Sequence, residues 1–497
     1  MMTVNSGKKS INAKIAAGIM ALSIAGLAFY ASVERAGAQP PEKTGIEAIT
    51  AEINAALRSS ALEGAGASIA VIDLATSKTI YTHNPDHLLI PASNMKIITA
   101  AAALDILKPE YRFKTEVYVD SLRNGVIEGN LYLKGYGDPI LMDEQLWTIA
   151  RDVAYRGARQ VTGSVFADDT FFDDQRYGRG WGELGPEAFN APIGALSLNF
   201  NTFVVTAVPG PRVGQPPRVF LMPPDKHLEI TNRAQTSANG QARIRVIEVA
   251  DKVNAYDVVG SVPINSEGAT VRRNIGDPGL YTAGSFEAYL MGWGIATSGK
   301  IGRKPAPKGA TLLTTYQSPP LSQAIWSMGK ISNNFVSEQI LKTMGAETAP
   351  EGKPRVGTFE GGVQTVQKFL TGLGIAPDSY VMVDGSGLSR LNRLTARQLA
   401  TVLSYVYKNP SFRPEFMTSL GIGGVDGTVE DRFQNGALRR RVRAKTGHLN
   451  GVNSISGYLE TEKGAMIAFS IIFNDFRGYH STVERVEERI LTILSRY

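Results

Sequence analysis

The chain has 497 residues, of which 43% are hydrophobic and 20% charged, a composition that is typical of a globular protein and excludes a disordered or collagen-like chain. It contains no cysteine, which excludes disulfides, thiolate metal sites, a cysteine nucleophile and a lipid-bearing N-terminal cysteine. A chain of this length can bury a large core without covalent staples. Its net charge of +6 is small for its length.

The segment 1–38 has the layout of a secretory signal peptide, with a basic start, an apolar run and small residues before the expected cleavage site. The apolar run, residues 15–31, is near the lower length limit for spanning a bilayer, so an uncleaved membrane anchor is the alternative. Cleavage before Gln39 removes four basic residues and one acidic residue and lowers the net charge from +6 to about +3, which argues against nucleic-acid binding. We therefore expect a secreted protein without a stable membrane anchor. The residues that carry this pattern are Lys8, Lys9, Lys14, Ala36, Gly37 and Ala38.

The first part of the expected fold lies before residue 110. Apolar residues at spacings of three and four predict an amphipathic helix over 45–57. Runs of β-branched and apolar residues predict paired strands at 68–74 and 79–83, joined by a short turn. A long helix is expected over 93–107, and because apolar and small residues surround it, we expect it to be buried on all sides.

Residues 111–301 differ from the segments on either side, because they are rich in glycine, proline and short strand-like runs. Helices dominate after them, and the chain ends with two strands and a helix. Because the two ends of a domain often lie close together, we interpret the chain as one discontinuous α+β domain, residues 39–110 and 302–497, interrupted by a β-rich insertion at 111–301. The helices expected after the insertion are 321–344, 361–373, 395–407 and 481–494, and the strands are 452–459 and 465–473.

The chemistry-bearing residues point to a serine enzyme whose base is not histidine. The sequence contains no H-E-x-x-H pair and no cysteine, so we expect no metal and no cofactor. It also contains no G-x-S-x-G elbow, which argues against an α/β-hydrolase. Ser93 and Lys96 form an S-x-x-K pattern, which on a helix places both side chains on one face. A lysine there can accept the serine proton if burial or nearby positive charge lowers its pKa. The pattern alone is weak, because two other pairs fit it: Ser6/Lys9 and Ser327/Lys330.

The order of three motifs is more specific than any one of them. One set runs S-x-x-K at Ser93, S-x-N from Ser332 to Asn334 and K-T-G from Lys445 to Gly447, each in a suitable element. Each motif also has an ordinary structural alternative, since serine and asparagine cap helices and K-T-G is compatible with a turn. The K-T-G is expected directly before the strand at 452–459. We interpret the ordered set as functional.

This ordered set resembles the penicillin-binding proteins and serine β-lactamases, and most closely the low-molecular-mass class C penicillin-binding proteins, which are D-alanyl-D-alanine carboxypeptidases and endopeptidases. The similarity covers essentially the whole mature chain. It implies a penicilloyl-serine transferase fold, with an antiparallel sheet flanked by helices, and two smaller domains in the insertion. The segments that carry it are Pro91-Ala-Ser-Asn-Met-Lys96, Gly137-Asp-Pro139, Ser332-Asn-Asn334, Asp384-Gly-Ser-Gly-Leu-Ser-Arg390 and Gly424-Val-Asp-Gly-Thr428.

The resemblance also implies roles for the motif residues. Ser93 would attack the carbonyl of the penultimate D-Ala and carry the acyl group, with Lys96 as the base. Ser332 would relay a proton to the leaving amine, and Lys445 would hold this network electrostatically. Asn334 would bind the substrate amide.

The K-T-G segment would form an edge strand that pairs with the substrate peptide. Lys445 and Thr446 would contact its terminal carboxylate, next to Gly447. The backbone N–H groups of Ser93 and His448 would form the oxyanion hole. His448 differs from the hydroxyl residue that is more usual after K-T-G in this family, so we expect its backbone, not its side chain, to be used.

Two further residues each have a functional and a structural interpretation. Arg390 follows an Asp-Gly-Ser-Gly turn, and it either contacts substrate or belongs to a structural loop near the cleft. Asp173 belongs to an acidic cluster in the insertion, which is either a solvated loop or a site for the ammonium group of a diaminopimelate side chain. The other acids of this cluster are Asp168, Asp169 and Asp174.

The expected function is a periplasmic serine D,D-peptidase that acts on peptidoglycan stem peptides and is acylated by β-lactam antibiotics. A β-lactamase is the first alternative, although the class C lactamases have a tyrosine where this chain has Ser332. A non-enzymatic peptidoglycan-binding protein is the second, and the intact set of Ser93, Lys96, Ser332 and Lys445 argues against it. The basic run at 439–443 is interpreted as a solvated surface rather than a nucleic-acid site. The oligomeric state, a homodimer included, stays open.

Overall fold

The computed structural model describes residues 45–182, 185–434 and 436–497. The predicted signal peptide, 1–38, lies outside the described residues, and so does the choice between cleavage and an anchor. Within the described ranges, none of the helices combines the length and the apolar character needed to span a bilayer. The first helix, α1 (Gly45–Leu57), has the bounds that its apolar spacing predicts.

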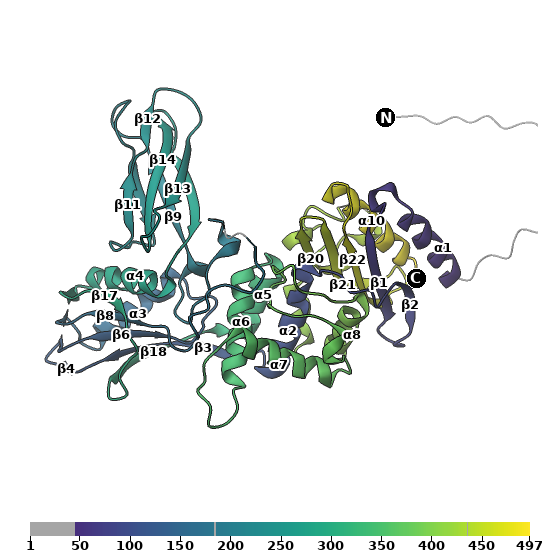
Figure 1. Ribbon diagram of the computed structural model, residues 1–497, viewed down its shortest axis with the longest axis horizontal. Coiled ribbons are helices and arrows are strands. Elements are labelled where there is room, and N and C mark those ends of the chain that lie inside the picture. The colour runs from purple at the N-terminus through teal and green to yellow at the C-terminus, as the bar shows by residue number, and fades with distance from the viewer. Residues whose placement is uncertain (1–44, 183–184, 435) are drawn as a thin grey trace, which may run out of the picture. The chain divides into compact units, whose positions relative to one another are not determined.

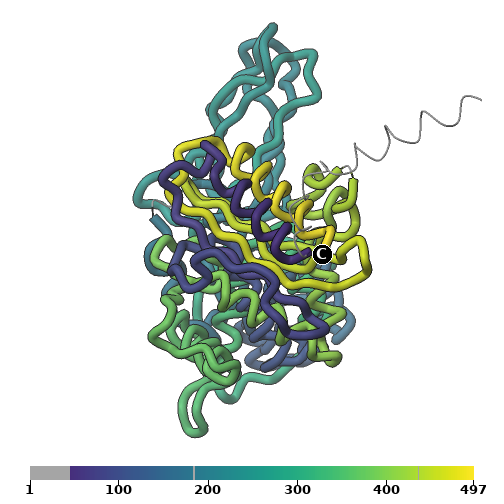
Figure 2. The backbone as a smooth tube through the Cα atoms, turned by 90° about the vertical axis from the view of Figure 1, so that its right-hand side faces the viewer, coloured from purple at the N-terminus to yellow at the C-terminus, as the bar shows by residue number. Residues whose placement is uncertain are grey.

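Strands from the beginning and the end of the described chain form one six-stranded antiparallel sheet (Figure 1). Its order is β19-β20-β21-β22-β1-β2, and β1 pairs with β22 so that Ala70 lies opposite Ser470. In Figure 2 the purple strands β1 and β2 run alongside the yellow C-terminal strands. The antiparallel sheet that the resemblance implies is therefore confirmed. The strands are β1 Gly66–Asp73, β2 Thr79–His83, β19 Gly421–Ile422, β20 Val442–Leu449, β21 Val452–Glu460 and β22 Met466–Asn474.

Helices cover both faces of this sheet. The hydroxyl of Tyr458, on β21, donates to the carbonyl of Leu403 on α8 at 2.8 Å. Asn453 is an odd number of positions away on the same strand and so points to the opposite face, where it donates to Glu487 on α10 at 2.7 Å. The helices of this part of the chain are α2 Met95–Ile106, α5 Leu321–Lys330, α6 Asn334–Glu347, α7 Phe359–Gly372, α8 Ala396–Lys408, α9 Arg413–Ser419 and α10 His480–Leu494.

The helix α2 is buried on all sides, as expected, and it packs against α5, α6, α7 and α8. Its many alanines leave room for these neighbours at close range. The helix begins at Met95 and not at Ser93, because residues Ala92–Asn94 form a separate 3₁₀ turn. Ala92 has a φ of +47°, a left-handed conformation that an α-helix does not contain.

The single helix predicted over 321–344 is wrong, because the chain breaks between α5 and α6. Ser332 lies in the break with a φ of +57°. Asn333 then caps α6, and its side-chain oxygen accepts a hydrogen bond from the backbone N–H of Val336. A periodicity argument does not detect the break, because the apolar spacing continues across it.

The insertion contains a five-stranded sheet with the order β17-β8-β6-β3-β18. The strand that comes last in the chain, β18, pairs with the strand that comes first, β3, with Thr315 opposite Glu116. The sheet therefore continues past residue 301. We therefore propose Pro320 as the end of the insertion, because an inserted unit has to return the chain to its starting point. The strands are β3 Arg112–Val119, β6 Leu131–Gly135, β8 Val165–Asp168, β17 Ile301–Arg303 and β18 Thr311–Pro320, and the helices beside them are α3 Asp143–Tyr155 and α4 Pro278–Gly292.

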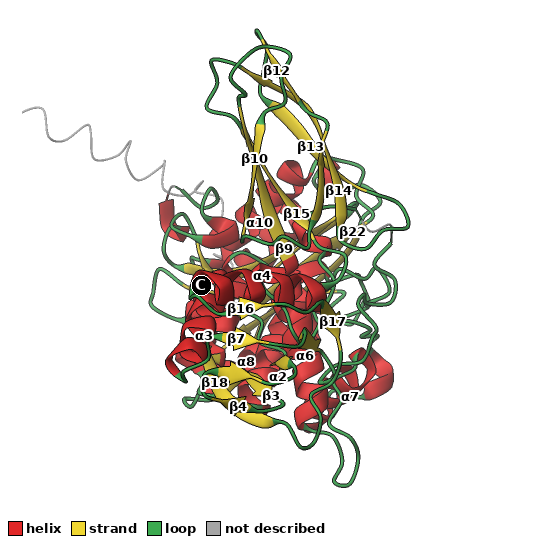
Figure 3. Ribbon diagram, turned by 90° about the vertical axis from the view of Figure 1, so that its left-hand side faces the viewer, coloured by secondary structure: helices red, strands yellow, loops and turns green. Residues whose placement is uncertain are grey.

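A second group of strands is nested inside the insertion, between residues 202 and 274 (Figure 3). One sheet has the order β10-β9-β15, and in the other β14 pairs with β11, β12 and β13. The two sheets meet where β13 packs against β15. The strands are β9 Thr202–Val208, β10 Arg218–Met222, β11 Glu229–Asn232, β12 Gln235–Ser237, β13 Arg243–Glu248, β14 Ala255–Pro263 and β15 Ala269–Asn274.

Candidate active site

The S-x-x-K pair lies where the 3₁₀ turn meets α2. Lys96 Nζ is 3.0 Å from Ser93 Oγ. The Ser93 side chain is half-buried, whereas Lys96 is 1% exposed. A hydroxyl that is open to solvent on one side and faces an amine on the other has the geometry of an activated nucleophile.

The surroundings of Lys96 decide its protonation. Its Nζ also donates to Asn334 Oδ1 at 2.7 Å and to the Ser386 carbonyl at 2.7 Å. Burial lowers the pKa of Lys96 to about 7, while the carboxylates of Glu338 and Asp384 act in the opposite direction. Near neutral pH both the amine and the ammonium are accessible, which is the condition for moving a proton in both directions.

The segment 384–387 holds the Ser386 carbonyl against Lys96. Glu338 accepts hydrogen bonds from the backbone N–H groups of Gly385 (2.9 Å) and Ser386 (2.7 Å). A side chain on Gly387, which has a φ of +80°, would collide with the Ala92 carbonyl. The Asp-Gly-Ser-Gly segment therefore supports the 3₁₀ turn that carries Ser93. Asp384 closes the turn by accepting from Gly387 N, Ser389 N, Asn392 Nδ2 and Trp181 Nε1.

Sequence reasoning missed Glu338. It is fully buried on α6, one helical turn after Asn334, so both side chains face α2. A glutamate four positions after a motif residue, and so on the same face of the helix, was the available signal. Burial and the nearby Asp384 raise its pKa to about 8.

A second serine–lysine pair faces the first. Lys445 Nζ donates to Ser332 Oγ at 2.8 Å and to the Thr446 carbonyl at 2.8 Å. Burial and the charge of Lys96 lower the pKa of Lys445 well below its usual range. Two positive charges that are buried close together repel each other. The arrangement therefore favours a state in which only one of the two lysines, Lys96 or Lys445, carries a proton on its amine as ammonium.

The K-T-G segment lies in the strand β20, directly before β21, as expected. The short strand β19 pairs only with Arg443 and Ala444 of β20. In the described chain the positions from Lys445 onward pair with β21 alone, so their other edge is open to an added strand. The hydroxyl of Thr446 is hydrogen-bonded to that of Thr428 at 2.7 Å.

Gly447 lies directly against the 3₁₀ turn Ala92–Asn94, which carries Ser93. A Cβ at this position would collide with Ser454 Oγ and would be 2.8 Å from Ser93 N. We expect Gly447→Ala to lower kcat/KM about 10²-fold, because a displacement of about 1 Å at a reacting group has an effect of that size. Hydrolysis of a D-Ala-D-Ala peptide measures it.

Gly309→Ala is the matched control for this substitution, because its Cβ would meet no atom within 4 Å. Equal activity of Gly447→Ala and the wild type would show that the close packing of β20 against the turn that carries Ser93 is not needed for catalysis.

The remaining predicted residues are His448, Arg390 and Asp173, and the side chain of each contacts another part of this chain. His448 Nε2 is 3.0 Å from Glu484 Oε1 on α10. Arg390 Nη1 donates to the Asn450 carbonyl at 2.9 Å, in the turn that follows β20. Asp173 forms an ion pair at 2.5 Å with Lys342, whose side chain is fully buried. The carboxylate of Asp173 thus already neutralises a cation of this chain.

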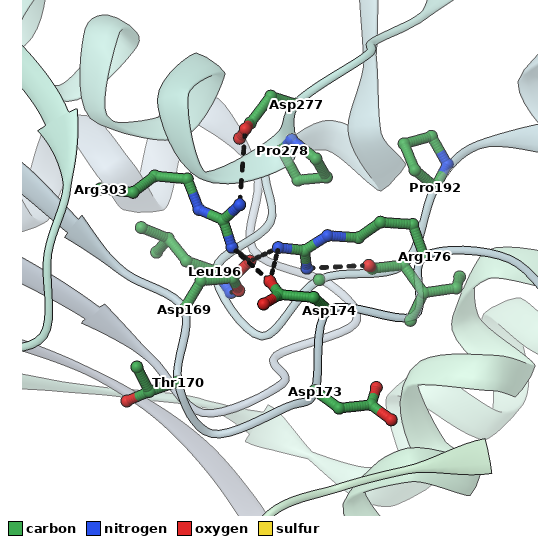
Figure 4. A network of polar contacts seen from close by, with 12 residues as sticks. Asp169, Thr170, Asp173, Asp174, Arg176, Pro192, Leu196, Asp277, Pro278 and Arg303 are labelled. Carbon is green, nitrogen blue, oxygen red and sulfur yellow. Dashed lines mark hydrogen bonds and ion pairs between the residues drawn. The ribbon is translucent and has the colours of Figure 1, made fainter.

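The rest of the acidic cluster is also paired, as Figure 4 shows for Asp169 and Asp174. Arg176 and Arg303 each contact both carboxylates, and Arg303 also contacts Asp277. This network joins the segment after β8 to the start of α4. The acidic cluster therefore forms ion pairs within the chain, and Asp174 remains exposed to solvent.

A hydrogen bond from Asn334 also connects the insertion with the candidate site. Asn334 Nδ2 donates to the carbonyl of Phe189 at 3.2 Å, while its Oδ1 accepts from Lys96. The Phe189 side chain itself is 55% exposed. Among the described residues no cluster of three or more histidine, aspartate or glutamate side chains has the arrangement to hold a metal ion.

Residues 49–493 match the D-Ala-D-Ala carboxypeptidase 3 (S13) family. The chain belongs to this family. The resemblance inferred from the ordered motifs is thus confirmed, and the coarse activity that follows from family membership is that of a D-Ala-D-Ala carboxypeptidase.

The sequences of two relatives align with this S13 chain along most of its length. The D-alanyl-D-alanine carboxypeptidase of Actinomadura sp. (strain R39) is 36% identical over 443 residues, which cover 86% of this chain and 81% of that protein. The D-alanyl-D-alanine carboxypeptidase DacB of Haemophilus influenzae is 26% identical over 83% of this chain and 86% of its own length. The crystal structure of penicillin binding protein 4 (dacB) from Haemophilus influenzae superposes with a TM-score of 0.77 at 23% identity, over 90% of this chain and 99% of that one, and shows the same fold.

Proposed function

We propose that this S13 chain is a serine D,D-peptidase that forms an acyl-enzyme on Ser93 and acts on peptidoglycan in the periplasm. In this proposal it cleaves both D-Ala-D-Ala termini and D-Ala-diaminopimelate cross-links. The observation that carries the proposal is the 3.0 Å contact of Ser93 Oγ with a buried lysine whose pKa lies near 7. The facing Ser332–Lys445 pair, at 2.8 Å, supplies a second proton carrier.

The first half of the reaction transfers the acyl group to the enzyme. Ser93 Oγ bonds to the carbonyl carbon of the penultimate D-Ala, and the hydroxyl proton goes to Lys96 Nζ. Ser332 relays this proton from Lys96 to the leaving nitrogen as the peptide C–N bond breaks, so that Lys96 is again a neutral amine, and Lys445 holds Ser332 by its hydrogen bond. The products are an ester on Ser93 and a free amine.

Hydrolysis of the ester reverses these roles. Water loses a proton to the neutral Lys96 and bonds to the same carbonyl carbon, and Lys96 then gives this proton to Ser93 Oγ as the C–O bond to Ser93 breaks. Backbone N–H groups of Ser93 and His448 would stabilise the oxyanion in both halves. Both cleavage activities follow from one reaction, because the leaving amine belongs either to D-Ala or to a diaminopimelate side chain.

Substrate binding uses the open edge of β20 in this proposal. The peptide would pair with the strand at Gly447, and Thr446 and Lys445 would contact its terminal carboxylate. Asn334 would bind the substrate amide, which requires that the Phe189 carbonyl leave Asn334 Nδ2. A β-lactam would acylate Ser93 by the same attack, and a Haemophilus influenzae penicillin binding protein 4 structure of this fold is complexed with a β-lactam.

Digestion of purified muropeptides tests the proposal, with the Ser93→Ala protein as the blank. Release of free D-Ala from pentapeptides measures carboxypeptidase activity, and conversion of cross-linked dimers to monomers measures endopeptidase activity. We expect both products with the wild type and neither with the blank. A wild-type protein that turns over nitrocefin faster than about 1 per second, but releases neither product, would instead be a β-lactamase.

A further inference from the structure

A groove of about 360 Å³ lies on the nested part of the insertion, between β13 and β15. Three of its lining residues are arginines, and one, Glu187, is acidic. The arginines come from both strands, as Arg245 on β13 and Arg272 and Arg273 on β15. The floor of the groove is apolar, formed by Ile244, Val246 and Val271 among others.

The three guanidinium groups have no anionic partner among the described residues. No carboxylate of these residues lies within 4.0 Å of Arg245, Arg272 or Arg273, although Arg176 and Arg303 each contact two or more in Figure 4. The Nε atom of Arg273 is buried and makes no hydrogen bond in the described chain. A groove lined by guanidinium groups without carboxylate partners favours an anionic ligand.

A short segment connects this groove to the candidate active site. Asn274, which follows Arg273 on β15, donates through its side chain to the carbonyls of Gly185 (3.1 Å) and Asn190 (3.4 Å). Pro186 and Glu187 of that segment line the groove. Its Phe189 carbonyl accepts from Asn334, the residue that contacts Lys96. The groove and the Ser93–Lys96 pair thus lie on either side of one segment.

We propose that the arginine groove binds carboxylate groups of a second stem peptide, the one that is cross-linked to the peptide in the active site. This inference rests on the proposed function. Guanidinium groups match carboxylates with two parallel hydrogen bonds, and a stem peptide carries several carboxylates along its length. Glu187 lines the end of the groove that is nearest the active site, where its negative charge repels a carboxylate. We therefore expect the carboxylates of the ligand to bind at the arginines and not at that end.

The double variant Arg245→Gln/Arg273→Gln tests the groove. We expect KM for cross-linked muropeptide dimers to rise about five- to tenfold, because charge-assisted hydrogen bonds to partly exposed groups have effects of this size. We expect kcat, and all constants for a short N-acyl-D-Ala-D-Ala peptide, to stay unchanged. The rise in KM should shrink at high salt, because salt screens exposed charges.

Arg243→Gln is the matched control, since Arg243 lies on β13 two positions before Arg245, on the same face, and does not line the groove. An unchanged KM for dimers in the double variant, or an equal rise with the short peptide, would overturn the proposal. Equally tight calorimetric binding of polyphosphate, weakened by the same variant, would also overturn the assignment to stem-peptide carboxylates.

The calorimetric measurement also separates this proposal from the proposed function. It uses the Ser93→Ala protein and intact dimers, so it needs no turnover. Binding that the double variant weakens supports the groove even if the wild type hydrolyses nothing, an outcome that would refute the peptidase proposal alone. Hydrolysis without any groove effect would refute the groove alone.

Discussion

Ser93→Ala is expected to lower kcat/KM for a D-Ala-D-Ala peptide by about 10⁴-fold or more, because the covalent step then has no nucleophile. Intact-protein mass spectrometry with benzylpenicillin gives an independent readout. The wild type should gain the mass of one penicilloyl group, and the variant should gain none. Stability should change little, because within the described residues Ser93 Oγ takes part in a single hydrogen bond, from Lys96.

Ser327→Ala provides the matched control for this prediction. Ser327 belongs to the other S-x-x-K pair in the described chain, on α5, and its Lys330 is held by Asp426 in an ion pair at 2.6 Å. We expect this variant to keep its activity and its acylation. Penicilloyl mass on Ser93→Ala protein would show that another residue is the nucleophile.

Lys96→Met is expected to lower kcat/KM by about 10² to 10⁴-fold, the usual contribution of a positioned general base. The wild-type pH profile tests the same role. Burial lowers the pKa of Lys96 to about 7, and only the neutral amine accepts the proton of Ser93. Activity should therefore fall tenfold per pH unit below about 7 and reach a plateau above it.

Lys108→Met serves as the control for the profile, because Lys108 lies exposed just beyond the end of α2. Its profile should match that of the wild type. A wild-type kcat/KM that stays constant between pH 5 and pH 9 would exclude a base with a pKa near 7 and with it the role of Lys96.

The local elements could be predicted from the sequence, because they depend on neighbours within a few positions. The spacing of apolar residues predicts the helix at Gly45–Leu57, and runs of β-branched and apolar residues predict the hairpin of β1 and β2. The ordered motifs identified the family, since Ser93, Ser332 and Lys445 had to occur in one order in suitable elements. Sequence reasoning failed where geometry overrides periodicity, at the break between α5 and α6.

The sequence by itself determined the family, through three motifs in one order, and it predicted a serine–lysine pair, one turn apart, as the carrier of the chemistry. Tertiary structure alone decided how those residues behave. The pKa of Lys96 depends on burial and on carboxylates, Glu338 and Asp384, that are distant in sequence. Gly447 has to be a glycine only because β20 packs against the Ser93 turn. Both properties are set by contacts between distant segments, and desolvation and close packing act through space and not along the chain.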